Sequence, residues 1–218
     1  MLRRRAAILL ATILTGSACA GRRVPTFGPA GAEEAERALA AWRQSVERAE
    51  IRPAKLLYDA RVSQGPFRMS GTLAVRAGAQ SVEATLAGPF GDTLANYAGG
   101  VFTGKNIRPL RIDEQELRWF LAGAWRGAGQ PEIGGTSGGK ALLRWSGPEE
   151  VEAILDIPSA RVSSLEVRRR EGAIRATYPE GSAHPEGPAG RPRRIDLEDL
   201  KSGNVMKLTL VAEEPIHD

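Results

Sequence analysis

The chain has 218 residues, a formal net charge of +4 at pH 7 and one cysteine, Cys19. A single cysteine excludes a disulfide within the molecule, and this length fits one ordinary domain. Arg3, Arg4 and Arg5 stand at the N-terminus, and subtracting their three charges from +4 leaves +1 for the rest of the chain. We therefore expect no nucleic-acid partner, because such proteins usually present a basic face with stacking aromatic side chains.

The N-terminal sequence has the pattern of a secretory signal. A positive segment is followed by the short apolar stretch 6–14 and then by small residues. That stretch is shorter than the roughly 20 apolar residues of a transmembrane helix. The segment T-G-S-A-C, which ends at Cys19, resembles a bacterial lipobox. We expect a signal peptide at 1–18, lipidation of Cys19 and a flexible tether at 19–31. The alternative for a lone cysteine is a small buried side chain.

Regular elements are predicted in chain order from the spacing of apolar residues. Helical spacing predicts a helix near 32–50, and alternation after Pro53 predicts half-buried strands. Asp113 and Glu116 have the spacing of a capping box and begin an inserted helix. The glycine-rich segment 126–140 and the Pro- and Gly-rich segment near 179–192 are expected to be loops. The predicted strands cover 56–62, 69–75, 82–86, one region through 94–102, 140–146, 150–157, 162–169, 173–178, 192–198 and 205–212.

The order of these elements predicts the fold class. About ten strands follow one another without a βαβ rhythm, so the sheet is antiparallel. A sheet this long tends to curl, and its apolar face must be covered. We expect an α+β fold over 32–218: a strongly curved, incomplete antiparallel β-barrel, with the N-terminal helix and the inserted helix covering its concave face.

This architecture resembles the LolA/LolB half-barrel superfamily, and three segments resemble its LolB branch. They are ATLAGPFGDTLANY (84–97), ELRWFLAGAWRG (116–127) and RPRRIDLEDLKSGNVMKLTLVAEEP (191–215). The resemblance extends over most of 32–212. It implies an outer-membrane lipoprotein that receives other lipoproteins from a periplasmic LolA-like carrier and inserts them into the membrane. Acyl chains would bind in an apolar hollow between the sheet and the helices.

The resemblance also implies where the site residues lie. Phe90, next to Pro89, matches a projecting hydrophobic turn that contacts the membrane, although leucine is usual there. The sequence leaves open whether Phe90 is exposed or folds back under a helix. Apolar residues of the strands and the inserted helix would line the acyl-chain hollow, and the alternative is that they pack a dry core. The proposed lining residues are Leu73, Leu86, Leu117, Phe120, Leu121 and Leu143.

Catalytic chemistry is not expected. His184 and His217 are the only histidines, and neither belongs to a cluster with metal-ligand spacing. GGTSGGK (134–140) lacks the spacing of a phosphate-binding loop. We expect no enzyme, metal or cofactor. The basic runs 168–170 and 191–194 are either a solvated surface or a contact for anionic head groups.

Two functions remain from the sequence. The first is a monomeric lipoprotein, anchored at the periplasmic face of the outer membrane, whose partners are the membrane, acyl chains or lipids, and a LolA-like carrier. The alternative is a structural or assembly lipoprotein of the envelope that uses the sheet as a protein-binding surface and carries no lipid cargo.

Overall fold

The computed structural model describes residues 25–49, 53–78, 81–104, 107–126, 129–179 and 191–216. The expected signal peptide, Cys19 and both histidines lie outside these residues. The helices are α1 (Ala32–Arg48) and α2 (Glu114–Ala122). The strands are β1 (Ala54–Gln64), β2 (Phe67–Ala77), β3 (Val82–Ala87), β4 (Thr93–Ala98), β5 (Val101–Gly104), β6 (Ile107–Arg111), β7 (Glu132–Ser137), β8 (Lys140–Trp145), β9 (Glu150–Asp156), β10 (Arg161–Arg169), β11 (Gly172–Thr177), β12 (Arg194–Asp199) and β13 (Asn204–Pro215).

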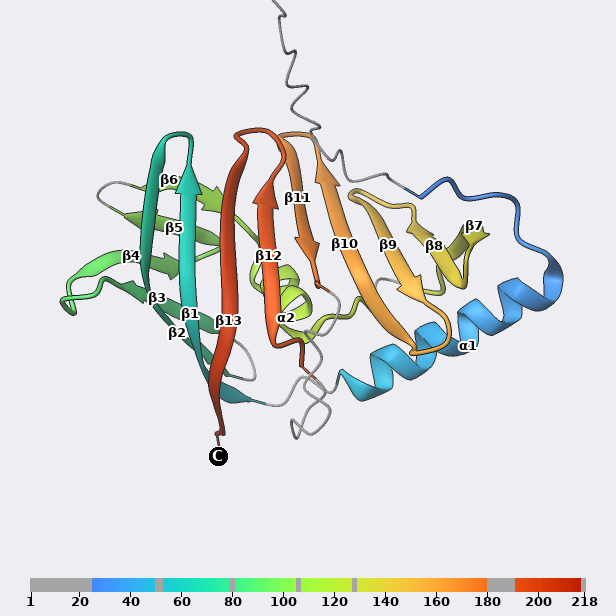
Figure 1. Cartoon of the computed structure of the whole chain (residues 1–218), viewed down its shortest axis with the longest axis horizontal. Coiled ribbons are helices and arrows are strands. Elements are labelled where there is room, and N and C mark those ends of the chain that lie inside the picture. Colours follow the sequence, from blue (N-terminus) through green and yellow to red (C-terminus); the bar gives the residue numbers. More distant parts are fainter. Residues whose placement is uncertain are drawn as a thin grey trace, which may run out of the picture.

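All these strands form one sheet in the order β6-β5-β4-β3-β2-β1-β13-β12-β11-β10-β9-β8-β7. Strands that are neighbours in sequence pair with each other, except β6 and β7. Strand β13 returns beside β1 and so joins the two meanders β1–β6 and β7–β13. Every pairing is antiparallel. In Figure 1 the strands β4–β6 run almost across β1, so the sheet curls strongly. It does not close into a barrel, because β6 and β7 remain its two edges.

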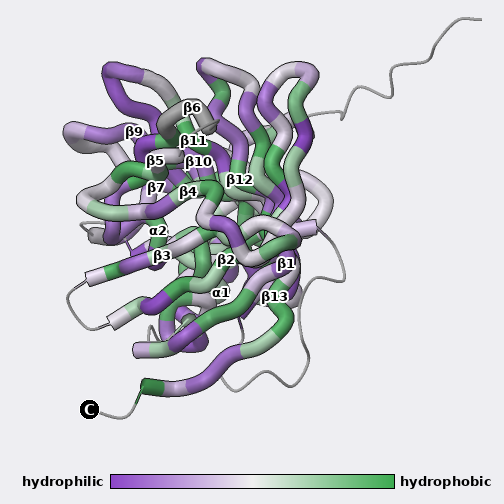
Figure 2. Tube along the Cα trace, turned by 90° about the vertical axis from the view of Figure 1, so that its left-hand side faces the viewer, coloured by the Kyte–Doolittle hydropathy of each residue, from purple (hydrophilic) through white to green (hydrophobic). Residues whose placement is uncertain are grey.

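Alternation along the strands separates a buried face from a solvated one, as the sequence predicts. In β1 the side chains of Ala54, Leu56, Tyr58, Ala60 and Val62 are buried, and those between them are exposed. Figure 2 shows hydrophilic and hydrophobic residues alternating along β1, β2 and β13. The buried faces of both meanders contribute to one core cluster, which also contains side chains of α1 and α2.

The predicted number of strands is wrong. The region 94–102 contains β4 and β5, which are separated by a tight turn at Gly99 and Gly100, where φ is +57° and +81°. A further strand, β6, follows, and β7 lies inside the glycine-rich segment expected to be a loop. Glycine weakens the alternation signal because it has no side chain, but the β8 ladder and core contacts of Ile133 hold β7 in place.

The free edge of β7 is partly covered by the segment before α1. The amide of Gly28 donates to the carbonyl oxygen of Thr136 (3.1 Å), and the amide of Thr136 donates to the carbonyl oxygen of Gly28 (2.9 Å). A Cβ at Gly135 would collide with that Gly28 carbonyl, so the close approach requires glycine. Part of the expected tether thus lies against the sheet and protects its edge.

Helix α1 covers one half of the sheet, where it contacts β7, β9 and β10 (Figure 1). Its buried residues are Ala38, Ala41 and Ser45, which are small and allow a close approach to the sheet. The longer side chain of Trp42 is only partly buried, although it packs against the core cluster.

Helix α2 lies inside the curve of the sheet, behind β11 and β12 in Figure 1. Its capping box is confirmed: Asp113 accepts from the amide of Gln115 (2.8 Å), and Glu116 accepts from the amide of Asp113 (3.0 Å). The helix ends at Gly123, whose φ of +67° favours glycine. Six of its nine residues are buried, so α2 fills the interior.

Candidate functional site

The six side chains predicted to line a hollow all lie in the main core cluster. They come from β2, β3 and β8 on the sheet and from α2 on the opposite side. Leu73 and Leu86 are direct cross-strand partners. All six are almost fully buried: Leu73, Leu86, Leu117, Phe120, Leu121 and Leu143. The structure therefore brings them together as packed core, with the side chains of α2 filling the space between the walls.

Two buried tyrosines hold the ends of α2 to the sheet. The hydroxyl of Tyr97 in β4 donates to the carbonyl oxygen of Ile112 before the helix (2.8 Å). The hydroxyl of Tyr178, just after β11, donates to the carbonyl oxygen of Phe120 in the last turn (2.9 Å). Burial raises the pKa of both tyrosines far above the usual value, so both remain protonated donors.

An ion pair fixes the first turn of α2. Glu116 is only 2% exposed and pairs with Arg169 at the end of β10. The Nε of Arg169 also donates to Glu149 in the β8–β9 turn (2.9 Å). Desolvation raises the pKa of Glu116, and the hydrogen bond and charge of Arg169 oppose this shift only in part. On the other side of the helix, Arg118 donates to the carbonyl oxygen of Gly78 (2.5 Å). These polar contacts hold the helix in the interior.

A cleft of about 380 Å³ opens beside this ion pair. Trp145 forms one wall, and its Nε1 donates to the carbonyl oxygen of Gly129 (3.1 Å). Trp42 of α1 contacts the Trp145 ring edge-on, with centroids 6.1 Å apart, and its Nε1 donates to the carbonyl oxygen of Trp125 (3.0 Å). The cleft is lined by Trp125, Gly129, Gln130, Glu132, Arg144, Trp145, Ser146, Gly147, Pro148, Glu149 and Val151. Val151 belongs to the core cluster, so the floor of the cleft reaches the interior. No pattern in the sequence indicates this cleft, because its walls meet only in the folded chain.

The turn at 88–92 exposes Phe90. The amide of Gly88 donates to the carbonyl oxygen of Asp92 (2.7 Å), and the amide of Gly91 donates to that of Gly88 (3.0 Å). These bonds close a tight turn and leave Pro89 and Phe90 at its tip, where Phe90 is 97% exposed. Of the two alternatives that the sequence left open, the structure has the exposed one.

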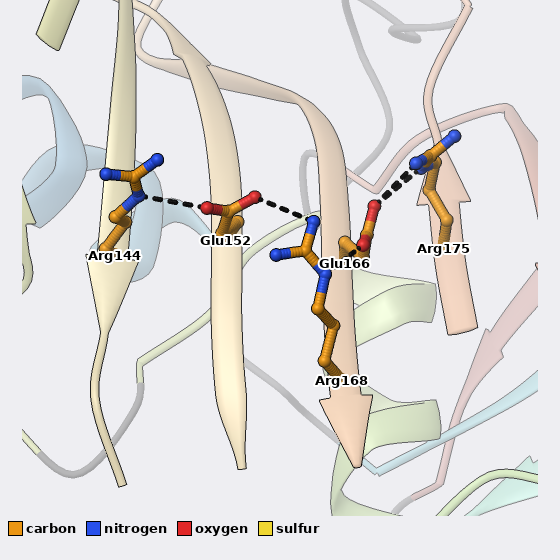
Figure 3. Close-up of polar contacts among 5 residues, drawn as sticks. All are labelled: Arg144, Glu152, Glu166, Arg168 and Arg175. Atoms are coloured by element: carbon orange, nitrogen blue, oxygen red, sulfur yellow. Dashed lines mark hydrogen bonds and ion pairs between the residues drawn. The ribbon is translucent and has the colours of Figure 1, made fainter. Parts of the chain in front are cut away.

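Five charged side chains form a ladder across the outer face of β8–β11 (Figure 3). Glu152 accepts from Arg144 (2.9 Å) and from Arg168 (3.2 Å). Glu166 accepts from Arg168 (2.6 Å) and from Arg175 (2.7 Å). Such pairs stabilise adjacent strands, and they leave little unbalanced charge on this part of the surface.

The two basic runs are paired only in part within the protein. Arg168 belongs to the ladder and Arg169 to the ion pair with α2, so only Arg170 of that run is exposed without an acidic partner among the described residues. Arg191 is 4% exposed and pairs with Glu213 of β13 (2.8 Å). Arg193 and Arg194 are exposed and make no ion pair with any residue that the structure describes. The contacts therefore favour a structural role for Arg168, Arg169 and Arg191 only.

No group of three or more His, Cys, Asp or Glu side chains among the described residues could hold a metal ion. In the same part of the chain, neither helix has the length and apolar composition needed to cross a membrane.

Comparison with known proteins finds similarity in the fold and no match by sequence. No family model matches the chain, and no curated protein matches its sequence. A LolA superfamily protein from Nitrosomonas europaea has a similar structure, with a TM-score of 0.53 and 16% identity over 81% of this chain and 94% of that chain. Two others have lower TM-scores. A DUF1329 family protein from Desulfovibrio piger scores 0.49, with 6% identity over 84% of this chain and 93% of its own. A domain assigned as an outer membrane lipoprotein-sorting protein from Vibrio parahaemolyticus scores 0.43, with 9% identity over 83% and 93%. The Nitrosomonas protein supports the assignment: the chain has a LolA/LolB-like fold.

Proposed function

We propose that this protein is a lipid-anchored lipoprotein of the outer membrane that binds acyl chains between its sheet and α2 and transfers lipoproteins or lipids to that membrane. The proposal rests on one observation, which is that a single short helix fills the interior of the half-barrel. The concave face of the sheet is apolar, and one nine-residue helix occupies the space in front of it. Likeness to a LolA superfamily protein supports the proposal through the fold.

The mechanism is an exchange of apolar contacts. When α2 moves away from the sheet, the side chains of Leu117, Phe120 and Leu121 leave the walls formed by β2, β3 and β8. An acyl chain then takes their place. Each buried CH₂ group contributes about 0.8 kcal/mol, so a chain of ordinary length offsets the loss of a few helix contacts. No covalent step is required, and we propose that the protein is not an enzyme.

The cleft beside Trp125 and Trp145 is the proposed entrance. Its floor at Val151 is part of the core, and Glu149 on its rim bonds to Arg169, which in turn pairs with Glu116 of α2. A ligand that enters the cleft and disturbs Glu149 therefore acts on the contact that fixes the first turn of the helix. The proposed release step uses the exposed Phe90, whose ring enters the apolar part of the bilayer.

Acyl-chain binding is tested with the mature full-length protein. The protein is extracted from host membranes in mild detergent, and native mass spectrometry is used to look for bound lipid. A fluorescent fatty-acid analogue is then added, with a diacylglyceryl-modified peptide as competitor. We expect saturable uptake that the competitor reverses. A folded sample that neither carries lipid nor takes up the probe would contradict the proposal and favour the assembly role without lipid cargo.

Delivery is tested separately in the host. Depletion of the protein should leave other lipoproteins stranded away from the outer membrane. A defect confined to one protein complex, with lipoprotein distribution unchanged, would instead support the assembly role.

A further inference from the structure

Exposed large hydrophobic side chains are few among the described residues. They are Leu57 (37%), Val211 (57%), Phe67 (72%) and Phe90 (97%). The two most exposed are phenylalanines, and both lie at turns between strands: Phe90 between β3 and β4, and Phe67 at the start of β2. The proposed release step uses Phe90, but nothing in the acyl-binding mechanism requires an exposed ring at position 67.

The β1–β2 hairpin carries Phe67 beyond the neighbouring strand. The hairpin is paired to its tip, where Gln64 lies opposite Phe67 across the turn at Gly65 and Pro66. Strand β2 pairs with β3 only from Thr72 to Ala77. Five residues of β2 therefore extend past the end of that ladder, which corresponds to about 17 Å of strand. On the other side β1 pairs with β13 as far as Ser63, so the hairpin is free along its β2 edge only; its turn is visible at the top of Figure 1.

The projecting part of the hairpin has one apolar and one basic face. Phe67 and Met69 are separated from Leu73 by an even number of positions, so their side chains lie on the same inner face of β2. Arg68 lies on the opposite, outer face of β2. Arg61 lies on the same outer face in β1, where exposed residues alternate with buried ones. Both arginines are exposed, and neither makes an ion pair with any residue that the structure describes. The sequence from 60 to 77 contains arginines but no aspartate or glutamate.

The β1–β2 hairpin and the segment that precedes α1 lie on opposite halves of the sheet, because Gly28 pairs with Thr136 at the β7 edge. Antiparallel order places the β1–β2 and β3–β4 turns along the same rim of the curled sheet, with the first at the top and the second at the left of Figure 1. In Figure 1 the first described residues, 25–30, lie at the upper right beside β7, and the β1–β2 hairpin lies at the upper left. The six residue steps from Cys19 to Pro25 span at most about 22 Å, so a lipid attached at Cys19 holds the β7 half of the sheet near the bilayer. A contact at the β1–β2 hairpin would bring the other half to the same surface.

We propose that the β1–β2 hairpin is a second membrane contact, in which Phe67 enters the apolar layer of an anionic bilayer and Arg68 and Arg61 bind its head groups. An exposed aromatic ring beside unpaired arginines is the composition of an interfacial anchor. The proposal rests on the membrane location given under Proposed function, but it does not depend on acyl-chain binding. Two contacts, at Phe67 and Phe90, restrain the tilt of the domain, which a flexible tether alone would leave free.

The test uses a thiol introduced into the acylated, reconstituted protein. Because Cys19 is the only cysteine and is expected to be acylated, a Phe67→Cys variant has one reactive thiol. A bimane label is attached there, and its quenching by nitroxide-bearing lipids is measured in vesicles of phosphatidylethanolamine and phosphatidylglycerol. Ser81→Cys is the matched control, since Ser81 is exposed beyond the opposite end of β2. We expect strong quenching at 67 and none above background at 81.

The charge contribution is tested by adding Arg68→Glu to the labelled protein. We expect the quenching at 67 to fall toward the control value on anionic vesicles and to change little on phosphatidylcholine vesicles. Circular dichroism confirms that each variant is folded. A label at 67 that is no more quenched than the label at 81 would overturn the proposal.

A third label separates this inference from the proposed function. Quenching at Phe90→Cys without quenching at 67 contradicts the second contact and leaves the proposed function intact. Quenching at 67 in a protein that takes up no fatty-acid analogue supports the second contact and contradicts acyl-chain binding.

Discussion

The hydroxyl of Tyr178 donates to the carbonyl oxygen of Phe120 at 2.9 Å and so ties the end of β11 to the last turn of α2. Both residues are buried, and the bond joins the wall of the half-barrel to the helix that fills it. Since the proposed function requires α2 to leave the interior, this contact controls how easily it does so.

Removal of that hydroxyl should loosen α2. Tyr178→Phe leaves the Phe120 carbonyl buried without its donor, which costs about 1–3 kcal/mol of the free energy of unfolding. Urea denaturation measures this loss, and the rate of fatty-acid-analogue uptake should rise. Tyr58→Phe is the matched control, because the Tyr58 hydroxyl is buried without a hydrogen-bond partner among the described residues. It should be neutral or stabilising, and an equal loss in both variants would show that the bond to Phe120 has no special role.

The buried Glu116 should make stability depend on pH. Desolvation raises the pKa of this carboxyl in the folded protein, so the folded state binds its proton more tightly than the unfolded state. The stability that comes from the protonated form is present below the unfolded pKa and is lost as pH rises through the folded pKa. Glu116→Gln lacks this loss. Urea midpoints measured from pH 4.5 to 7 should therefore shift in favour of the variant as pH rises, and a constant difference would contradict the raised pKa.

Phe90→Glu distinguishes membrane contact from packing. Because the ring is almost fully exposed, the free energy of unfolding should change by no more than about 0.5 kcal/mol. Delivery of lipoproteins to the outer membrane, measured by fractionation of a strain that carries the variant, should fall. Unchanged delivery would exclude a role for this turn.

Substitution at Gly135 should release the segment that covers the edge of β7. In Gly135→Ala the new methyl group collides with the carbonyl oxygen of Gly28 and breaks the pairing between Gly28 and Thr136. The amides of those two residues should then lose protection from hydrogen exchange. Gly28→Ala is the control, since a Cβ there meets no atom within 4 Å. Retained protection in Gly135→Ala would contradict the close approach.

Much of the fold follows from local patterns. Alternation locates β1, β2 and β3, and most of the later strands, to within a few residues, because one face of each is buried and the other solvated. Asp113 and Glu116 locate the start of α2, since a capping box uses only residues three apart. The glycine-rich β7 was missed because no alternating side chains mark it. Strands β4 and β5 were merged because the turn between them is very short, and β6 was not predicted.

The sequence by itself determined the class of fold, the residues at which the helices begin, and the excess of positive charge in the segment from 60 to 77. Only the tertiary structure decided which residues meet. It pairs Arg169 with Glu116, places Trp42 against Trp145 from a distant part of the chain, and leaves Phe90 outside the core. These outcomes depend on how far the sheet curls and on where β13 joins β1. Curvature and strand order arise from contacts far apart in sequence, so periodicity along a single strand contains no information about them.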